Sequence, residues 1–292
     1  MLSPIELGLV NRVSVFNEQW AYLRPRTIVT LWAVWNEPRV YGDIIPPSYA
    51  SLRQFQGMTG YTSRMCGRFR VARKKEILEA AFEVATSLDD LDWVPRYNVA
   101  PGQEISVVQQ DANRPVRLLS TMRWGLIPSW AKEPSVGYKM INARSETVAA
   151  KPSFLEPLRS RRCLIPADGF YEWKREGKQK LPYCFTLADE NIFAFAGLWD
   201  RWRSPEGQFI ESCTILTTTP NELMQDVHDR MPVILMPEDY DLWLDPGFTK
   251  MEELQPLLKP YDADAMRCYR VSQRVNQVKN DDPECAVEIE AA

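Results

Sequence analysis

Cys66 has the most distinctive chemistry in this sequence, because it follows a methionine in the run Met65-Cys66-Gly67-Arg68-Phe69. As an internal residue of a strand it would pack like a small hydrophobic side chain. If synthesis began at Met65 and that residue were removed, Cys66 would carry a free α-amine beside its thiol. The pKa of an α-amine is about 7.7–8.0, so a far larger fraction is neutral and nucleophilic at pH 7 than for a lysine amine. Such an aminothiol attacks an aldehyde to form an imine, which the thiol closes into a thiazolidine ring.

A polar run further along the chain offers an amide and a guanidinium close together. In an extended segment, alternation places Asn142, Arg144 and Glu146 on one face. The simplest interpretation is a solvated strand edge or the start of a helix. In the functional interpretation, the amide of Asn142 holds a sugar hydroxyl or an imine, while Arg144 binds a phosphate.

Two residues are candidates for acid–base chemistry. Glu172 follows an Asp168-Gly169 turn and lies among bulky aromatic residues in the run ADGFYEW, although most glutamates are solvated surface groups. An apolar niche would raise the pKa of this carboxyl toward the range that a general acid or base needs. His228 is the one histidine in the sequence. A lone histidine is more often structural, but any histidine-mediated proton transfer must use it.

Aromatic and basic residues are candidates for a nucleic-acid surface. Trp124 and Trp130 occur in the run RWGLIPSW, and we expect both in the core. If exposed, they would stack against bases beside Arg68, Arg144 and Arg230, as in proteins that hold single-stranded nucleic acid. The formal net charge of -4 requires any such surface to be a local basic patch.

Short β-prone runs separated by turns dominate the sequence from Met65 onward. They predict a largely antiparallel α+β domain with a curled sheet or partial barrel and flanking helices. The expected strands cover residues 65–71, 105–109, 116–119, 123–126, 163–166, 170–174, 183–187, 193–198 and 213–217. Helices are expected over residues 74–85 and 237–244, and capping boxes predict two more that begin after Thr219 and Thr249. Residues 97–103 are expected to form a loop around Pro101.

Residues 1–64 differ in composition from the rest of the chain. They contain no lysine or cysteine and carry six Arg against four acidic residues, whereas residues 65–292 carry 29 basic and 35 acidic residues. Their pattern offers too little core for an independent domain. We therefore expect residues 1–64 to be an extension that is non-native or removed. Residues 65–277 are expected to form the catalytic domain, and residues 278–292 a frayed acidic tail.

The composition excludes several classes of protein. With 45% hydrophobic and 25% charged residues, it is typical of a soluble globular domain. The longest apolar run, residues 27–35, is about half the length of a membrane span, and the first residues lack a secretory signal. Six cysteines without a CxxC pair argue against a zinc site. We expect free thiols, no metal and a cytoplasmic location.

Six motifs occur in a fixed order and are highly specific together: MCGRF, RYNVAPGQ, RWGLIPSW, INARSET, RCLIPADGFYEW and TTTPNELMQDVHDRMPVIL. Over residues 65–275 the sequence resembles the SRAP family, the SOS response-associated peptidase-like proteins. The resemblance implies a domain that crosslinks covalently to abasic sites in single-stranded DNA during the DNA damage or SOS response. It implies no cofactor, no metal and no membrane, and we expect a monomer associated with the nucleoid.

The resemblance also implies roles for individual residues. Cys66 matches the family's N-terminal cysteine, whose amine and thiol form the thiazolidine with the ring-opened sugar. Asn142 would position the sugar, Glu172 would shuttle protons in imine formation and in crosslink reversal, and His228 would protonate the ring oxygen. The matching phosphate contacts are Arg68, Arg144 and Arg230, and the residues lining the DNA cleft are Asn98, Pro101, Trp124 and Thr217.

The sequence departs from the family pattern in one respect, because 65 residues precede Cys66 and the family chemistry requires a free α-amine there. The explanation we favour is that translation begins at Met65. Alternatively, the segment is removed by proteolysis, including autocatalytic cleavage, or it is retained and the protein does not crosslink. Two other classes of function stay open: a thiol peptidase that uses Cys66, His228 and Asn142, and a non-covalent binder of single-stranded DNA.

Overall fold

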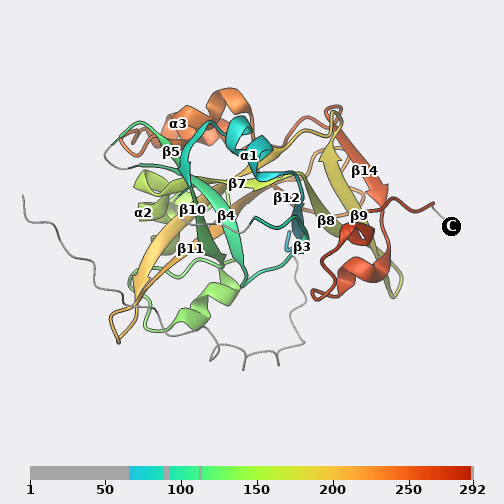
Figure 1. The fold of residues 1–292 in the computed structure, drawn as a ribbon, viewed down its shortest axis with the longest axis horizontal. Helices are drawn as coiled ribbons and strands as arrows, with labels where there is room; N and C mark the ends of the chain where they lie inside the picture. Colours follow the sequence, from blue (N-terminus) through green and yellow to red (C-terminus); the bar gives the residue numbers. More distant parts are fainter. Residues whose placement is uncertain (1–65, 88–92, 112–113, 291–292) are drawn as a thin grey trace, which may run out of the picture. The chain divides into compact units, whose positions relative to one another are not determined.

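The computed structural model describes residues 66–87, 93–111 and 114–290, in which strands far outnumber helices (Figure 1). This confirms the expected α+β class. The predicted extension over residues 1–64 lies outside the described residues. None of the helices in the described ranges is long and apolar enough to cross a membrane.

One antiparallel sheet of five strands carries the start of the described chain. Its order is β14-β9-β8-β1-β3, so β1 lies between β8 and β3. Phe69 of β1 is opposite both Val99 of β3 and Phe170 of β8, which brings the residues just before β1 next to β8. The five strands are β1 (Phe69–Val71), β3 (Arg96–Val99), β8 (Gly169–Glu176), β9 (Gln179–Leu187) and β14 (Met266–Arg270).

The second sheet has nine strands and curls into a barrel. Neighbours pair in the order β12-β11-β10-β7-β4-β5-β2, and β11 also pairs with β5, so five of these strands form a closed ring. The expected curled, barrel-like sheet is therefore confirmed. Most pairs are antiparallel, but β5 runs parallel to β2 and β11, and β6 runs parallel to β11. The strands are β2 (Val84–Ser87), β4 (Glu104–Gln110), β5 (Arg117–Trp124), β6 (Asn142–Arg144), β7 (Arg162–Ala167), β10 (Phe193–Arg203), β11 (Phe209–Thr218), β12 (Met231–Pro232) and β13 (Ile234–Leu235).

A single large apolar core joins the two sheets. The ring of Phe69 in β1 packs edge-on against Trp124 of β5, with centroids 5.2 Å apart, and against Phe195 of β10, at 5.8 Å. Short helices lie around the sheets (Figure 1). They are α1 (Lys75–Ala81), α2 (Pro152–Ser160), α3 (Tyr240–Leu244) and α4 (Met251–Leu254), with 3-10 turns at Pro134–Lys139, Val148–Ala150, Pro237–Asp239, Gln255–Leu257, Gln273–Asn276 and Pro283–Cys285.

Two local predictions near the start of the domain are wrong. The helix expected over residues 74–85 ends at Ala81, and Val84 begins strand β2, which pairs with β5. Glu83 makes this change of direction with a φ of 50°. Val84 and Thr86 are β-branched and gain more from sheet pairing than from another helical turn. Residues 96–99, expected as part of a loop, form β3.

Neither predicted capping box forms, and only the one at Thr249 is followed by a helix, as predicted. Residues 219–230 form turns, in which the side chain of Asn221 accepts a hydrogen bond of 3.0 Å from the backbone N–H of Met224. Local bonds of this kind compete with helix formation. Helix α4 begins at Met251, with Lys250 at its N-cap position and no side-chain cap.

The acidic tail is packed over its described part, residues 278–290, so the expectation that it frays is wrong. The carboxylate of Asp281 accepts hydrogen bonds from the backbone N–H groups of Tyr97 and Asn98 on the edge strand β3. It also pairs with Arg96, and Cys285 is fully buried. The acidic residue therefore satisfies backbone donors that an edge strand leaves unpaired.

Candidate active site

Cys66 lies just before β1 and is 4% exposed. Its carbonyl accepts a hydrogen bond of 2.6 Å from the amide nitrogen of Asn142, and its thiol donates to the carbonyl of Arg230 at 3.7 Å. Burial and the neighbouring carboxyl of Glu172 raise the pKa of the Cys66 thiol well above its ordinary value. The sulfur is therefore a neutral thiol at physiological pH, held against an acid–base partner.

Glu172 of β8 is 3% exposed, and burial raises the pKa of its carboxyl to about 7. The imidazole of His228 and a hydrogen bond with the Cys66 thiol act in the opposite direction. The raised pKa agrees with the sequence prediction, but the niche differs from the one expected. Tyr171 and Trp173 belong to a separate cluster, because alternate residues of a strand point to opposite faces.

His228 completes the acid–base pair from a turn rather than a helix. Its Nε2 lies 3.9 Å from the Oε2 atom of Glu172. Its Nδ1 lies 3.0 Å from both the backbone nitrogen and the carbonyl oxygen of Arg230. In a neutral ring Nδ1 accepts from that N–H, which leaves the proton on Nε2, facing Glu172.

Two buried acceptors in this group have no partner. They are Oε1 of Glu172 and Oδ1 of Asn142. Asn142 is the first residue of β6. Buried polar atoms in folded proteins are nearly always hydrogen-bonded, so unpartnered acceptors beside a nucleophile point to a substrate that donates to them.

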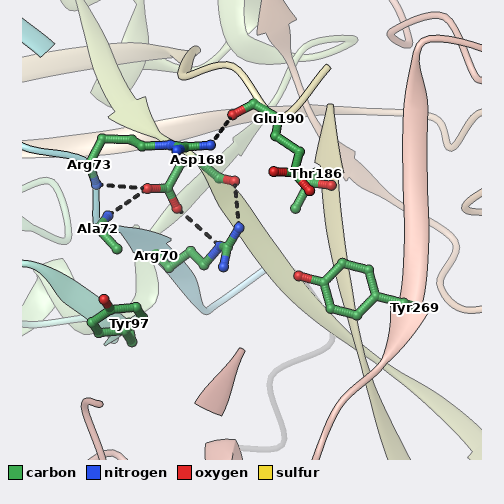
Figure 2. Close-up of a pocket in the computed structure, with 8 residues that line it drawn as sticks. All are labelled: Arg70, Ala72, Arg73, Tyr97, Asp168, Thr186, Glu190 and Tyr269. Atoms are coloured by element: carbon green, nitrogen blue, oxygen red, sulfur yellow. Dashed lines mark hydrogen bonds and ion pairs between the residues drawn. The ribbon is translucent and has the colours of Figure 1, made fainter. Parts of the chain in front are cut away.

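The four residues come from distant parts of the chain. Cys66 and Glu172 meet because β1 pairs with β8, and Asn142 joins them because β6 runs alongside β11. The Asp168 turn fixes the start of β8. Its carboxylate accepts from the backbone N–H groups of Ala72 and Arg73 and pairs with Arg70 at 3.0 Å, as Figure 2 shows.

The cavity drawn in Figure 2 is separate from the candidate active site. It has a volume of about 330 Å³ and none of the four candidate catalytic residues lines it. It is lined by Arg70, Ala72, Arg73, Tyr97, Asp168, Thr186, Glu190 and Tyr269. Within the described ranges, no group of three or more His, Cys, Asp and Glu side chains is arranged to hold a metal ion.

The predicted DNA contacts divide into exposed and buried residues. Arg144 is exposed, and Arg68 and Pro101 are half-buried. The other four are buried: Asn98, Trp124, Thr217 and Arg230. Trp124 is in the core, as expected, where its indole N–H donates to the carbonyl of Ile141 at 2.8 Å and neither face is open to a base.

Trp130 was expected in the core, but it is 63% exposed. The loop that carries it is held by Asp200, whose carboxylate accepts from the backbone N–H of Ser129 at 2.8 Å. Tyr138 nearby in the sequence is also exposed, and the guanidinium of Arg123 lies over its ring at 5.1 Å. The proline and serine before Trp130 are the loop signal that separates it from Trp124, which follows a strand pattern.

Residues 65–278 match the family described as SOS response associated peptidase (SRAP). The chain belongs to the SRAP family. The SRAP match begins one residue before Cys66 and includes all four candidate catalytic residues.

The chain is similar to several SRAP proteins. "Abasic site processing protein YoqW" of Bacillus subtilis (strain 168) is 51% identical, with 75% of this chain and 98% of the relative covered. "Abasic site processing protein HMCES" of Gallus gallus is 37% identical, with 67% of each chain covered. A crystal structure of a protein from Bacteroides thetaiotaomicron superposes with a TM-score of 0.70 at 29% identity, covering 77% of this chain and 100% of that one. This chain therefore shares its fold with that protein.

Proposed function

We propose that this SRAP protein is an abasic-site sensor that crosslinks covalently to abasic sites in single-stranded DNA through a thiazolidine at Cys66. The observation that carries the proposal is the contact between a buried neutral thiol and a carboxyl group whose pKa is about 7. A group that titrates near neutrality can both donate and accept protons in imine chemistry. The names of the relatives, abasic site processing proteins, support the same substrate.

Each step has a candidate residue. His228 donates a proton to the ring oxygen of the abasic sugar, the ring C–O bond breaks, and the C1 hydroxyl gives its proton to Glu172 as it becomes the aldehyde. The α-amine of Cys66 adds to the aldehyde carbon, and Glu172 protonates the resulting hydroxyl so that water leaves. The thiol sulfur then bonds to the imine carbon, and its proton passes to the nitrogen. One water is released overall, and no oxidant or reductant is needed.

The imine is also the intermediate from which a lyase would cut the strand. It acidifies the proton on the adjacent sugar carbon, so that the 3′ phosphate can leave by elimination. Closure of the thiazolidine removes the imine, and we propose that crosslinking therefore competes with a lyase-type cleavage in this site. The exposed Arg144 and Trp130 are suited to bind phosphate and to stack on a neighbouring base.

This chemistry requires the α-amine of Cys66 to be free, and we propose that the working protein lacks residues 1–64 and also Met65, which is removed after translation or in the same proteolytic cut. YoqW supports this, because 98% of it aligns with 75% of this chain, so a quarter of this chain has no counterpart in it. Translation from Met65 and proteolytic removal give the same product. Mass spectrometry of the N-terminus in the native host tests the proposal, and a mature N-terminus at Met1 would overturn it.

A thiol peptidase is the second candidate that the family description suggests. Peptidase nucleophiles need a lowered thiol pKa, whereas burial and Glu172 raise the pKa of Cys66. The site therefore favours imine chemistry over peptide cleavage. We further propose that the protein acts as a monomer in the cytoplasm, where it meets single-stranded DNA at the nucleoid.

The test uses the protein that begins at Cys66 and an oligonucleotide with one abasic site. We expect an adduct that survives a denaturing gel, is lost in Cys66→Ala and is absent with intact DNA. The full chain beginning at Met1 is run in parallel and should not form the adduct unless it is first processed. Peptide cleavage without an adduct would favour the peptidase, and salt-sensitive binding without an adduct would favour a non-covalent binder.

A further inference from the structure

Glu146 is a residue of the polar run that the proposed reaction leaves unused. It lies two residues after β6, and its carboxylate accepts two hydrogen bonds from Arg230, of 2.5 Å from Nη1 and 3.0 Å from Nη2. The same guanidinium donates to the carbonyl of Thr217 at 2.6 Å. The hydrogen bonds from Arg230 lower the pKa of Glu146, so the carboxylate is charged at neutral pH.

The backbone of Arg230 contacts both reactive side chains. Its carbonyl accepts from the thiol of Cys66 at 3.7 Å and lies 3.0 Å from Nδ1 of His228. Its backbone N–H donates to the same ring nitrogen at 3.0 Å. One peptide segment therefore sets the orientation of the thiol and the tautomer of the imidazole together.

We propose that Glu146 is a positioning residue, which acts through Arg230 to hold the turn at residues 228–230 in the geometry that aligns Cys66 and His228. The inference rests on the proposed crosslinking function. It gives Arg230 a structural role beside the phosphate contact that the resemblance implies, because one carboxylate accepts from two nitrogens of this largely buried side chain.

Glu146 can act through Arg230 because the two side chains are buried to different extents. The side chain of Glu146 is 46% exposed, whereas that of Arg230 is 11% exposed. The Nε atom of Arg230 already lacks a partner. Without the carboxylate the guanidinium must find other acceptors or move toward water, and the turn moves with it. A displacement of about 1 Å at reacting groups is enough to slow a reaction about a hundredfold.

The experiment compares Glu146→Gln and Glu146→Ala with Glu156→Gln in the protein that begins at Cys66. Glu156 is a matched control, because it pairs with Arg159 at 2.9 Å on the surface of α2 and touches none of the site residues. Crosslinking is followed at increasing concentrations of abasic single-stranded DNA, which separates the maximal rate from the half-saturating concentration. Thermal unfolding is recorded for each variant.

We expect Glu146→Ala to lower the maximal crosslinking rate at least tenfold while the half-saturating DNA concentration stays within twofold. Glu146→Gln, which keeps one acceptor, should recover part of the rate, and Glu156→Gln should match the parent. Arg230→Met should give a similar loss, and adding Glu146→Ala to it should cost little more, since both act through one contact.

Three results would overturn the inference. These are an unchanged maximal rate, a rate loss fully explained by a larger unfolded fraction, and tighter DNA binding as the main effect of Glu146→Ala. The last would show that Glu146 competes with phosphate for Arg230. If the parent protein forms no adduct at all, the proposed function fails instead, so the two failures are distinguishable.

Discussion

Two buried asparagines, one in each sheet, have contrasting surroundings. The amide nitrogen of Asn98 donates to the carbonyls of Val275, Gln277 and Asn280, and its oxygen accepts from Arg68 at 2.7 Å. Asn142 donates to one carbonyl, and its oxygen has no partner. The first amide is saturated and ties the C-terminal segment to β3. The amide of Asn142 has an oxygen that is free to accept a hydrogen bond. We take this difference to distinguish a group that binds substrate from one that stabilises the fold.

The same contrast separates the carboxylates. Asp281 is saturated by two backbone N–H groups and Arg96, whereas Glu172 has one oxygen without a partner and a pKa of about 7. If hydrogen-bond saturation distinguishes structural from chemical groups, substitutions in the first set should change stability. Those in the second should change the rate of crosslinking. The following predictions test this, all with the protein that begins at Cys66.

The largest effect is expected from Glu172→Gln, which removes the proton carrier and keeps the shape. The crosslinking rate should fall by about 10²–10⁴-fold. At high pH the variant should be more stable than the parent. In the parent, the folded carboxyl holds its proton up to a pKa of about 7, while the unfolded one releases it near 4.5. Unfolding free energy of the parent therefore falls as pH rises between these values, by on the order of 3 kcal/mol, and is level above pH 7.

Denaturant unfolding of the parent and of Glu172→Gln at pH 5 and pH 8 measures the effect on stability. We expect the unfolding free energy of Glu172→Gln, relative to that of the parent, to be higher at pH 8 than at pH 5. Asp168→Asn is the contrasting variant, because that carboxylate holds two backbone N–H groups and Arg70. It should lose stability at both pH values. A Glu172→Gln protein that crosslinks at the parent rate would remove Glu172 from the mechanism.

The two asparagines give the second test. Asn98→Ala removes one hydrogen bond from Arg68 and three to carbonyls of the C-terminal segment, so the unfolding free energy should fall by about 2–4 kcal/mol. Its crosslinking rate per folded molecule should be nearly unchanged. Asn142→Ala should cost about 1 kcal/mol of stability and slow crosslinking by on the order of a hundredfold. Denaturation curves and single-turnover gels measure both quantities, and equal effects of the two changes would refute the contrast.

Most strands of the fold and the main residues of the candidate site could be predicted from the sequence. Short β-prone runs indicated most strands, and the residue types of Cys66, Glu172 and His228 suggested the candidate site that the structure brings together. The partners of Asn98 could not be predicted, because they lie about 180 residues away, and one of them, Asn280, belongs to the acidic tail that was expected to fray. Local patterns also do not show that β6 runs parallel to β11, which is the pairing that brings Asn142 to Cys66.

Two tryptophans extend the comparison to the DNA surface. Trp130→Ala removes an exposed ring, and base stacking is worth about 1–3 kcal/mol, so affinity for single-stranded DNA should fall about five- to hundredfold with stability unchanged. Trp124→Ala opens a core cavity and should cost about 3–5 kcal/mol of stability. Fluorescence anisotropy with labelled DNA measures binding. Phe209→Ala, at an equally exposed ring at the start of β11, is the control and should bind like the parent.

The smallest effect is expected at the tail. Asp281→Ala removes the acceptor for the N–H groups of Tyr97 and Asn98 and the partner of Arg96, so the unfolding free energy should fall by about 1–2 kcal/mol. Glu290→Ala, at an exposed residue of the same tail, should change stability by less than about 0.5 kcal/mol. Hydrogen exchange at Tyr97 and Asn98 should speed up in Asp281→Ala alone. Equal stability of the two variants would mean that the tail does not hold β3. Loss of the Asp281 carboxylate lowers the unfolding free energy only if the tail is packed against that strand.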